Sequence, residues 1–308
     1  MRKRVVTILV ISVIMSITLT GCESDDYKDA VAYEESGDYE EALAIYSTIT
    51  DYKDSEERIT FCETMISAIA DYNSARELAD EKNSELDESI SNAENLIAAG
   101  STPLDESLIT SLETSISNAK AAKVSIEEMP ETAAEITNYA SVLSEIDYTD
   151  VLAAISASYT DLDRSIRQYA LVDAPSESYI IECLQKVENV VDISAVTEDN
   201  DPNGNLNKAG GYTAQVYFSS DLVDQDSVYG STIIEKGTDC GGSIEVYATV
   251  EDATKREEYL ASFDGTIFSS GSHAVVGTVL VRTSDELTAS QQKEMEADII
   301  SALTYLDE

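Results

Sequence analysis

The amino-acid sequence predicts an α plus α+β protein: a helical hairpin, a long antiparallel helical bundle or coiled coil, and a C-terminal α+β domain with an antiparallel sheet. The helical part is indicated by apolar residues that recur at three- and four-residue steps through residues 57–172. The second part is indicated by a change of pattern after Pro175, where short strand-like segments alternate with amphipathic ones. The expected segments are 1–21, 22–56, 57–173 and 174–308.

The N-terminus has the pattern of an export signal. Basic residues at positions 2 to 4 precede an apolar run that ends at Leu19, shorter than the roughly 20 residues of a membrane-spanning helix. The run closes with Leu19, Thr20, Gly21 and Cys22, which resemble the lipobox of bacterial lipoproteins. That resemblance implies cleavage before Cys22 and attachment of a diacylglycerol to its thiol. The alternative is an uncleaved signal anchor with a chance cysteine.

The charge of the chain limits its partners. Its 19 basic and 60 acidic residues give a net charge of −41. Removal of residues 1–21 takes away three basic residues and no acidic one, which leaves −44. Such a polyanion repels nucleic-acid phosphates, so we expect no nucleic-acid partner. The charge serves solubility or favours cationic partners and Ca²⁺. We expect contact with the membrane through the lipid anchor, and with a protein or cell-wall component beyond it.

A short internal repeat marks residues 22–56. Asp26-Tyr27-Lys28-Asp29 recurs 25 residues later as Asp51-Tyr52-Lys53-Asp54. Residues 26–55 resemble a tetratricopeptide repeat, which implies that Ala30 and Tyr33 face a partner helix, Gly37 makes the turn, and Ala42 and Tyr46 form the close contact. The pattern departs at Ile49 and Asp54. Because stable arrays need about three or more units, we expect a hairpin that caps the next helices, without a peptide-binding superhelix.

The sequence of the expected bundle, residues 57–173, indicates where its helices begin and end. Gly100 suits a helix C-terminus, Thr102-Pro103 suits a helix start, and Met129-Pro130 separates a second helix from a third. We therefore expect three antiparallel helices, the first of which, over residues 57–99, would be roughly 60 Å long. This segment is spacer-like, and its sequence has no inward-facing His or Glu-x-x-His pattern for a metal.

The C-terminal segment is expected to alternate helices and strands. The last helix begins with a capping-box signature at Thr288 and Gln291. The order of elements predicts helices packed on an antiparallel sheet, in a domain large enough to fold alone. The expected helices are 176–187, 252–263 and 289–306, and the expected strands are 190–196, 212–218, 243–249 and 274–282.

Three stretches of this segment have distinctive amino-acid sequences: Ala195–Ala214, Glu258–Gly265 and Gly271–Gln292. Together they resemble the C-terminal domain of predicted lipoproteins from Gram-positive, Clostridia-like bacteria, over about residues 176–306. The resemblance implies the extracellular face of the cell membrane, on a Gram-positive surface, and an α+β fold. It implies no activity, because that family has none established.

One loop has the residue types of a Ca²⁺ site. Asp199, Asp201 and Asn203 alternate as ligands do in an EF-hand loop, and Gly204 falls at its sharp turn. Gly210 stands where the bidentate carboxylate should be. The alternative is an ordinary turn between two strands, for which Asp-Pro-Asn-Gly is equally typical.

Cysteine and histidine give two further candidates. Outside the cytoplasm a disulfide is permitted, and Cys183 and Cys240 could pair because both lie in the same expected domain, whereas Cys62 is left over. His273 is the single histidine and lies beside serines, the residue types of a serine hydrolase. A structural role in its loop is the alternative.

These observations predict a non-enzymatic, membrane-anchored lipoprotein in which a helical stalk presents a small binding or assembly domain. A Ca²⁺- or ligand-binding sensor, such as a solute-binding lipoprotein, is the first alternative. A cell-wall hydrolase that uses His273 is the second. No cofactor is expected apart from Ca²⁺ in the first alternative.

Overall fold

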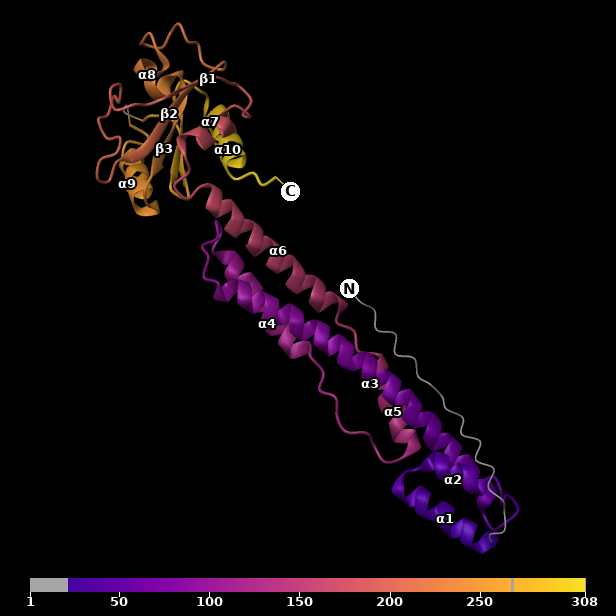
Figure 1. The fold of residues 1–308 in the computed structure, drawn as a ribbon. Helices are drawn as coiled ribbons and strands as arrows, with labels where there is room; N and C mark the ends of the chain where they lie inside the picture. Colours follow the sequence, from indigo (N-terminus) through magenta and orange to yellow (C-terminus); the bar gives the residue numbers. More distant parts are fainter. Residues whose placement is uncertain (1–21, 267–268, 308) are drawn as a thin grey trace. The chain divides into compact units, whose positions relative to one another are not determined.

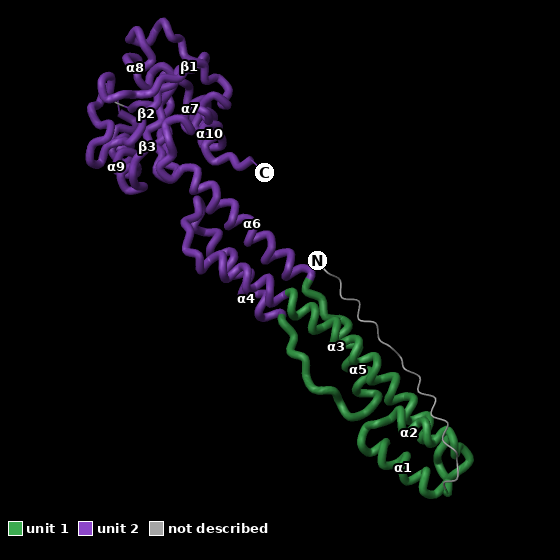
Figure 2. The backbone as a smooth tube through the Cα atoms, in the orientation of Figure 1, with its two compact units in different colours: residues 1–85, 123–148 green, residues 86–122, 149–308 purple. Residues whose placement is uncertain are grey.

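The computed structural model describes residues 22–266 and 269–307. Helices come first along the chain and an antiparallel five-stranded sheet with its own helices follows, which confirms the predicted α plus α+β class (Figure 1). The chain forms two compact units, residues 1–85 with 123–148 and residues 86–122 with 149–308 (Figure 2). The division falls inside the expected bundle and not at residue 174.

The first unit opens with a helical hairpin of α1 (Glu23–Ser36) and α2 (Tyr39–Tyr46), followed by α3 (Ser55–Ala98), whose residues from Leu86 onward belong to the second unit. Gly37 ends α1 in the left-handed region at φ +85°, a conformation that costs glycine no Cβ clash. The hairpin core consists of Tyr27, Ala30, Ala42, Tyr46, Ile49 and Cys62. Ala30, Ala42 and Tyr46 are thus buried as expected, but Tyr33 is 41 % exposed and does not face a partner helix.

The helix α3 is continuous for 44 residues, which corresponds to about 66 Å at 1.5 Å per residue. The second expected helix is shorter than its apolar pattern suggests: α4 (Ser107–Ala122) ends before Val124, and residues 123–130 have no regular secondary structure. Side chains satisfy the backbone of Val124 in this stretch. Asn83 Nδ2 donates to Val124 O at 3.1 Å, and Tyr148 Oη accepts from Val124 N at 2.9 Å. Here tertiary contacts override the helical period. The unit continues with α5 (Ala133–Ser144).

In the second unit, α4 packs along α6 (Thr149–Leu171), and the buried apolar residues are Leu112, Ile116 and Ala119 on α4 and Ile155 and Leu162 on α6. The apolar pattern predicted this seam. A buried serine adds a polar contact, because Ser165 O and Oγ accept from the backbone N–H groups of Leu104 and Asp105.

The C-terminal part contains five strands in the order β1-β2-β3-β5-β4, all paired antiparallel. The expected single strand over 274–282 is a hairpin of two strands, because Gly277 turns the chain at φ +57°. The helical bounds are α7 Glu177–Leu184, α8 Ile233–Lys236, α9 Val250–Ala261 and α10 Ala289–Leu303. The strand bounds are β1 Val190–Ala195, β2 Tyr212–Ser220, β3 Gly241–Tyr247, β4 His273–Val276 and β5 Val279–Thr283.

Helices cover both faces of this sheet. Ile180 of α7 and Ile299 of α10 pack with Val281 on one face, whereas Leu260 of α9 packs with Leu280 on the other (Figure 1). Adjacent strand residues point to opposite faces, so Leu280 and Val281 belong to different layers. The main apolar core therefore lies under α7 and α10.

The end of α6 is joined to the β4–β5 turn by hydrogen bonds. Val172 O accepts from Thr278 N at 2.9 Å and from Thr278 Oγ1 at 3.1 Å, and Ala174 N donates to Thr278 Oγ1 at 2.7 Å. A Cβ at Gly277 would lie 2.5 Å from Val172 O, so only glycine permits this approach. The boundary expected near Pro175 is therefore tied to the sheet and is not a free linker.

Candidate functional site

The expected lipidation site lies at the start of the described chain. Cys22 is exposed and forms the N-cap of α1, where its carbonyl oxygen accepts from Asp25 N at 2.7 Å and Asp26 N at 3.3 Å. Acidic residues in the first turn suit the positive end of the helix dipole. Leu19, Thr20 and Gly21, with the rest of the expected signal, lie outside the described residues.

The other three cysteines are all buried and free. The expected Cys183–Cys240 disulfide is therefore not formed. Cys183 belongs to the apolar core under α7, whereas Cys240 Sγ contacts backbone carbonyls, among them Gly237 O at 3.2 Å and Phe218 O at 3.4 Å. The two thiols thus lie in different surroundings. Burial raises the pKa of Cys240 to about 11 and also raises the pKa of Cys183, so both stay protonated and unreactive at neutral pH.

The loop that carries the candidate Ca²⁺ ligands uses its central carboxylate internally. Asp201 accepts from Asn203 N at 3.0 Å, from Leu206 N at 2.8 Å and from the hydroxyl of Tyr212. Burial raises the pKa of Asp201, but these hydrogen bonds outweigh it and hold the pKa below its ordinary value. Asp199 is exposed. The geometry is that of an Asx turn anchored to β2, which favours the plain-turn interpretation.

No group of three metal-ligating side chains was found within residues 22–266 and 269–307. Asp199, Asp201 and Asn203 are close in sequence, but the structure turns the Asp201 oxygens toward hydrogen-bond donors of the protein itself.

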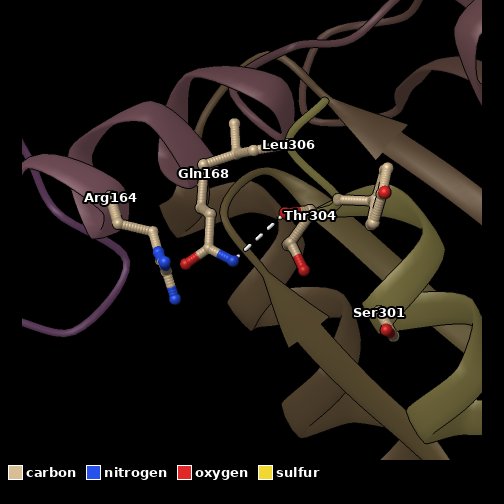
Figure 3. Close-up of a pocket in the computed structure, with 6 residues that line it drawn as sticks. Arg164, Gln168, Ser301, Thr304 and Leu306 are labelled. Atoms are coloured by element: carbon tan, nitrogen blue, oxygen red, sulfur yellow. Dashed lines mark hydrogen bonds between the residues drawn. The ribbon is translucent and has the colours of Figure 1, made fainter. Parts of the chain in front are cut away.

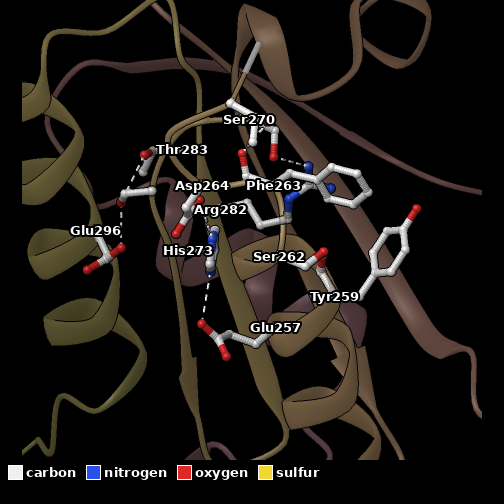
Figure 4. Close-up of polar contacts among 12 residues, drawn as sticks. Glu257, Tyr259, Ser262, Phe263, Asp264, Ser270, His273, Arg282, Thr283 and Glu296 are labelled. Atoms are coloured by element: carbon white, nitrogen blue, oxygen red, sulfur yellow. Dashed lines mark hydrogen bonds and ion pairs between the residues drawn. The ribbon is translucent and has the colours of Figure 1, made fainter. Parts of the chain in front are cut away.

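His273 lies at the start of β4 with its side chain almost fully buried between two carboxylates (Figure 4). Its Nδ1 is 3.1 Å from Glu257 Oε1 on α9, and its Nε2 is 3.3 Å from Asp264 Oδ1. The neighbouring serines contact other groups: Ser270 Oγ accepts from Arg282 Nη2, and Ser272 Oγ donates to Glu296. Both ring nitrogens therefore face acids, whereas a hydrolytic triad places one nitrogen against a hydroxyl.

A buried ionic cluster on the α9 side of the sheet was not anticipated from the sequence. Glu245, at the centre of β3, accepts from Arg282 Nη1 at 3.0 Å, from Arg256 Nε at 3.3 Å and from Tyr247 Oη at 2.6 Å. Burial and the neighbouring Glu245 raise the pKa of Tyr247, which keeps its hydroxyl a donor. The polar residues of this cluster, Gln215, Ser243, Glu245 and Arg282, lie on β2, β3 and β5. Only the pairing of Gln215 with Glu245 and of Ser243 with Arg282 gathers them on one covered face.

Among the described residues, three polar atoms of this face have no hydrogen-bond partner: Gln215 Oε1, Ser243 Oγ and Arg282 Nε. Unpartnered buried polar atoms are uncommon in folded proteins and destabilise the folded state. They lie on three neighbouring strands, beside the satisfied Glu245.

A shallow pocket of about 390 Å³ lies between α6 and the end of α10 (Figure 3). Arg164 and Gln168 line it from α6, and Ser301 and Thr304 from the other side. Gln168 Nε2 donates to Thr304 O at 3.1 Å, so this polar contact joins the walls of the pocket. The pocket has no cluster of acid, base and nucleophile among its lining residues.

Comparisons with protein-family models, with curated proteins and with solved structures give no match for this chain. Within the described residues, no helix is both long enough and apolar enough to cross a bilayer. A function for this chain therefore has to be inferred from its sequence, its fold class and its side-chain contacts.

Proposed function

We propose that the chain is a lipid-anchored extracytoplasmic protein that acts without catalysis, through contacts of its C-terminal α+β domain. The observation that carries the proposal is the lipobox-like run Leu19-Thr20-Gly21 directly before Cys22, after a basic and then an apolar stretch. The exposure of Cys22 supports it, because a modifying enzyme must reach the thiol. The other cysteines of the chain are buried.

The proposed mechanism is tethering. One acyl chain binds a membrane reversibly, whereas two hold a protein stably, so a diacylated Cys22 would make a permanent surface resident. The helices after Cys22 would act as a spacer, and the domain beyond residue 174 would contact a protein or cell-wall component. The hydrogen bonds between Thr278 and the end of α6 support this role, because they hold the sheet on its supporting helix.

Metabolic labelling with a clickable fatty acid tests the anchor. We expect the wild-type chain to take up the label and to fractionate with membranes, and Cys22→Ser to lose both properties. The matched control is Ser24→Ala, which changes a nearby residue after the expected cleavage point and should be labelled like wild type.

An unlabelled wild-type chain found in the cytoplasmic fraction would contradict the proposal. Label retained in Cys22→Ser would also contradict it, because the acyl group would then be attached elsewhere.

A further inference from the structure

His273 connects the edge of the sheet to two segments that precede it in the chain. Its side chain is only 6 % exposed. Nδ1 lies 3.1 Å from Glu257 Oε1 on α9, and Nε2 lies 3.3 Å from Asp264 Oδ1 in the turn that follows α9 (Figure 4). The strand that carries the ring, β4, is the terminal strand in the order β1-β2-β3-β5-β4. The ring therefore attaches both α9 and the turn after it to this terminal strand.

The protonation state of the ring decides how many of these contacts are hydrogen bonds. An ionised carboxylate only accepts hydrogen bonds. An imidazolium donates from both nitrogens, whereas a neutral imidazole donates from one nitrogen and accepts at the other. Only the protonated ring can therefore bond Glu257 and Asp264 at the same time. In the neutral ring, one nitrogen turns a lone pair toward a carboxylate, and that contact is lost.

The contact with Asp264 is the weaker of the two. It is the longer one, and the Asp264 side chain is 54 % exposed, compared with 30 % for Glu257. Water replaces the partner of an exposed carboxylate at little cost. We therefore expect the neutral ring to keep its proton on Nδ1, toward Glu257, and to lose its bond to Asp264.

Other charged groups near the ring are bonded elsewhere. They lie on four elements of the domain: Glu245 on β3, Arg256 on α9, Arg282 on β5, and Lys293 and Glu296 on α10. Both guanidinium groups donate to Glu245, and Lys293 pairs with Glu296. Within residues 22–266 and 269–307, the charged groups in hydrogen-bond contact with the ring are thus Glu257 and Asp264.

We propose that His273 is a proton-dependent clamp: the protonated ring holds the turn at residues 262–266 against β4, and loss of the proton releases this turn. The clamp is formed below the pH at which the ring loses its proton, and it opens as the pH rises through that point. α9 stays in place, because Arg256 still donates to Glu245 at 3.3 Å and Leu260 still packs with Leu280. The device thus acts on the turn and not on the helix.

The turn has backbone hydrogen bonds that report its release. Asp264 N donates to Ala261 O at 3.1 Å, and Thr266 N donates to Phe263 O at 3.0 Å. Local opening of such a segment exposes its amides to hydrogen exchange. The protection of residues 262–266, relative to the intrinsic exchange rate at each pH, therefore measures how often the turn opens.

The sequence contains a single histidine, so the ring and the turn can be followed separately. In protein purified without a histidine tag, the one imidazole signal in an NMR spectrum reports the proton on His273. Hydrogen exchange measured by mass spectrometry reports the protection of residues 262–266. We expect this protection to fall roughly fivefold as the ring loses its proton, as for the loss of one hydrogen bond. The two transitions should have the same midpoint.

Glu257→Gln distinguishes the clamp from a general loosening at high pH. The amide accepts from a protonated Nδ1 and donates to a neutral one, so the single proton of the neutral ring can remain on Nε2, facing Asp264. We expect the turn to stay protected on both sides of the titration. The matched control is Glu258→Gln, which removes the same charge from the adjacent, exposed position of α9 and should behave like wild type.

Three results would overturn the clamp. They are wild-type protection that does not change while the ring titrates, a loss of protection that persists in Glu257→Gln, and a loss that Glu258→Gln abolishes equally. His273→Gln is the second variant if Glu257→Gln fails to fold. Its side chain does not titrate, so the protection of the turn should be independent of pH, and a step that remains at the wild-type midpoint would also overturn the proposal.

Discussion

At the scale of single residues, the sheet of the C-terminal domain combines well-satisfied and unsatisfied polar groups on neighbouring positions. Glu245 receives three hydrogen bonds, while the hydroxyl of Ser243, two residues earlier on the same face, has no partner among the described residues. Removal of one partner from a buried pair is costly, whereas loss of an unpaired polar group is not. Substitution by alanine should therefore distinguish a buried serine that has a hydrogen-bond partner from one that has none.

Ser243→Ala is expected to leave the free energy of unfolding unchanged or to raise it slightly, because it removes a buried hydroxyl without a partner. Ser284→Ala is the matched comparison at another fully buried serine. Its hydroxyl donates to Asp239 O at 2.7 Å, so the substitution should cost about 1 kcal/mol or more. Urea unfolding of the two variants measures the difference. A larger loss in Ser243→Ala than in Ser284→Ala would show that Ser243 has a bonding partner after all.

Asp201 should contribute to the pH dependence of stability. Its pKa in the folded protein lies below the ordinary value of about 3.9. The carboxylate therefore contributes stability above about pH 3.9, and this contribution is lost as the pH falls through the lower folded-state pKa. Asp201→Asn should lower the melting temperature at neutral pH and weaken its fall in acid, whereas Asp199→Asn, at an exposed position, should follow wild type.

Thermal melts from neutral pH down into strong acid measure this effect. Identical acid limbs for wild type and Asp201→Asn would contradict it. The same melts with millimolar CaCl₂ test the metal alternative, because a Ca²⁺-dependent rise that disappears in Asp201→Asn would restore the Ca²⁺ site.

At the scale of elements, one hydroxyl makes two of the hydrogen bonds that join the end of α6 to the sheet. Thr278 Oγ1 donates to Val172 O and accepts from Ala174 N, so it bonds two residues of the segment that directly follows α6. The φ +57° turn at Gly277 brings it there. The hydrogen bonds of this short stretch orient the sheet relative to α6.

Thr278→Val keeps the shape of this buried side chain and removes its hydroxyl, which leaves Ala174 N without its acceptor. We expect a loss of about 1–3 kcal/mol in the free energy of unfolding. Thr278→Ser keeps the hydroxyl and is the control, with a smaller loss from the missing methyl group. Urea unfolding compares them. If the valine variant were as stable as the serine variant, the hydroxyl would not hold the two elements together.

At the scale of the whole molecule, the net negative charge opposes contact with anionic membranes, whereas the proposed lipid anchor favours membrane binding. Without residues 1–21 the chain carries −44, which keeps it soluble and resists contact with anionic surfaces. Each methylene of a bound acyl chain contributes about 0.8 kcal/mol to membrane binding, so two chains hold a protein firmly. If Cys22 is diacylated as proposed, the lipid rather than the protein surface decides residence at the membrane.

Local patterns in the sequence were sufficient to predict several features of the structure. The seam of α4 and α6 followed from apolar spacing, the start of α10 from the pair Thr288 and Gln291, and the burial of Ala30, Ala42 and Tyr46 from the repeat-like hairpin. These features depend on neighbours along one helix or on one helix pair. Helical periodicity and capping chemistry report such neighbours directly.

Features that combine distant segments were decided only by the tertiary structure. The irregular stretch after Ala122 contacts Asn83 and Tyr148, and the ionic cluster at Glu245 depends on the order of the strands. The two Asp-Tyr-Lys-Asp copies were visible in the sequence, but their mutual contact required the fold of the hairpin. Sequence alone predicted the fold class, which the structure confirms, and the export signal and lipidated Cys22 stay predictions of the sequence. Long-range packing decided which polar groups are in contact. Strand pairing and hairpin closure join residues that are not related by any local period in the sequence.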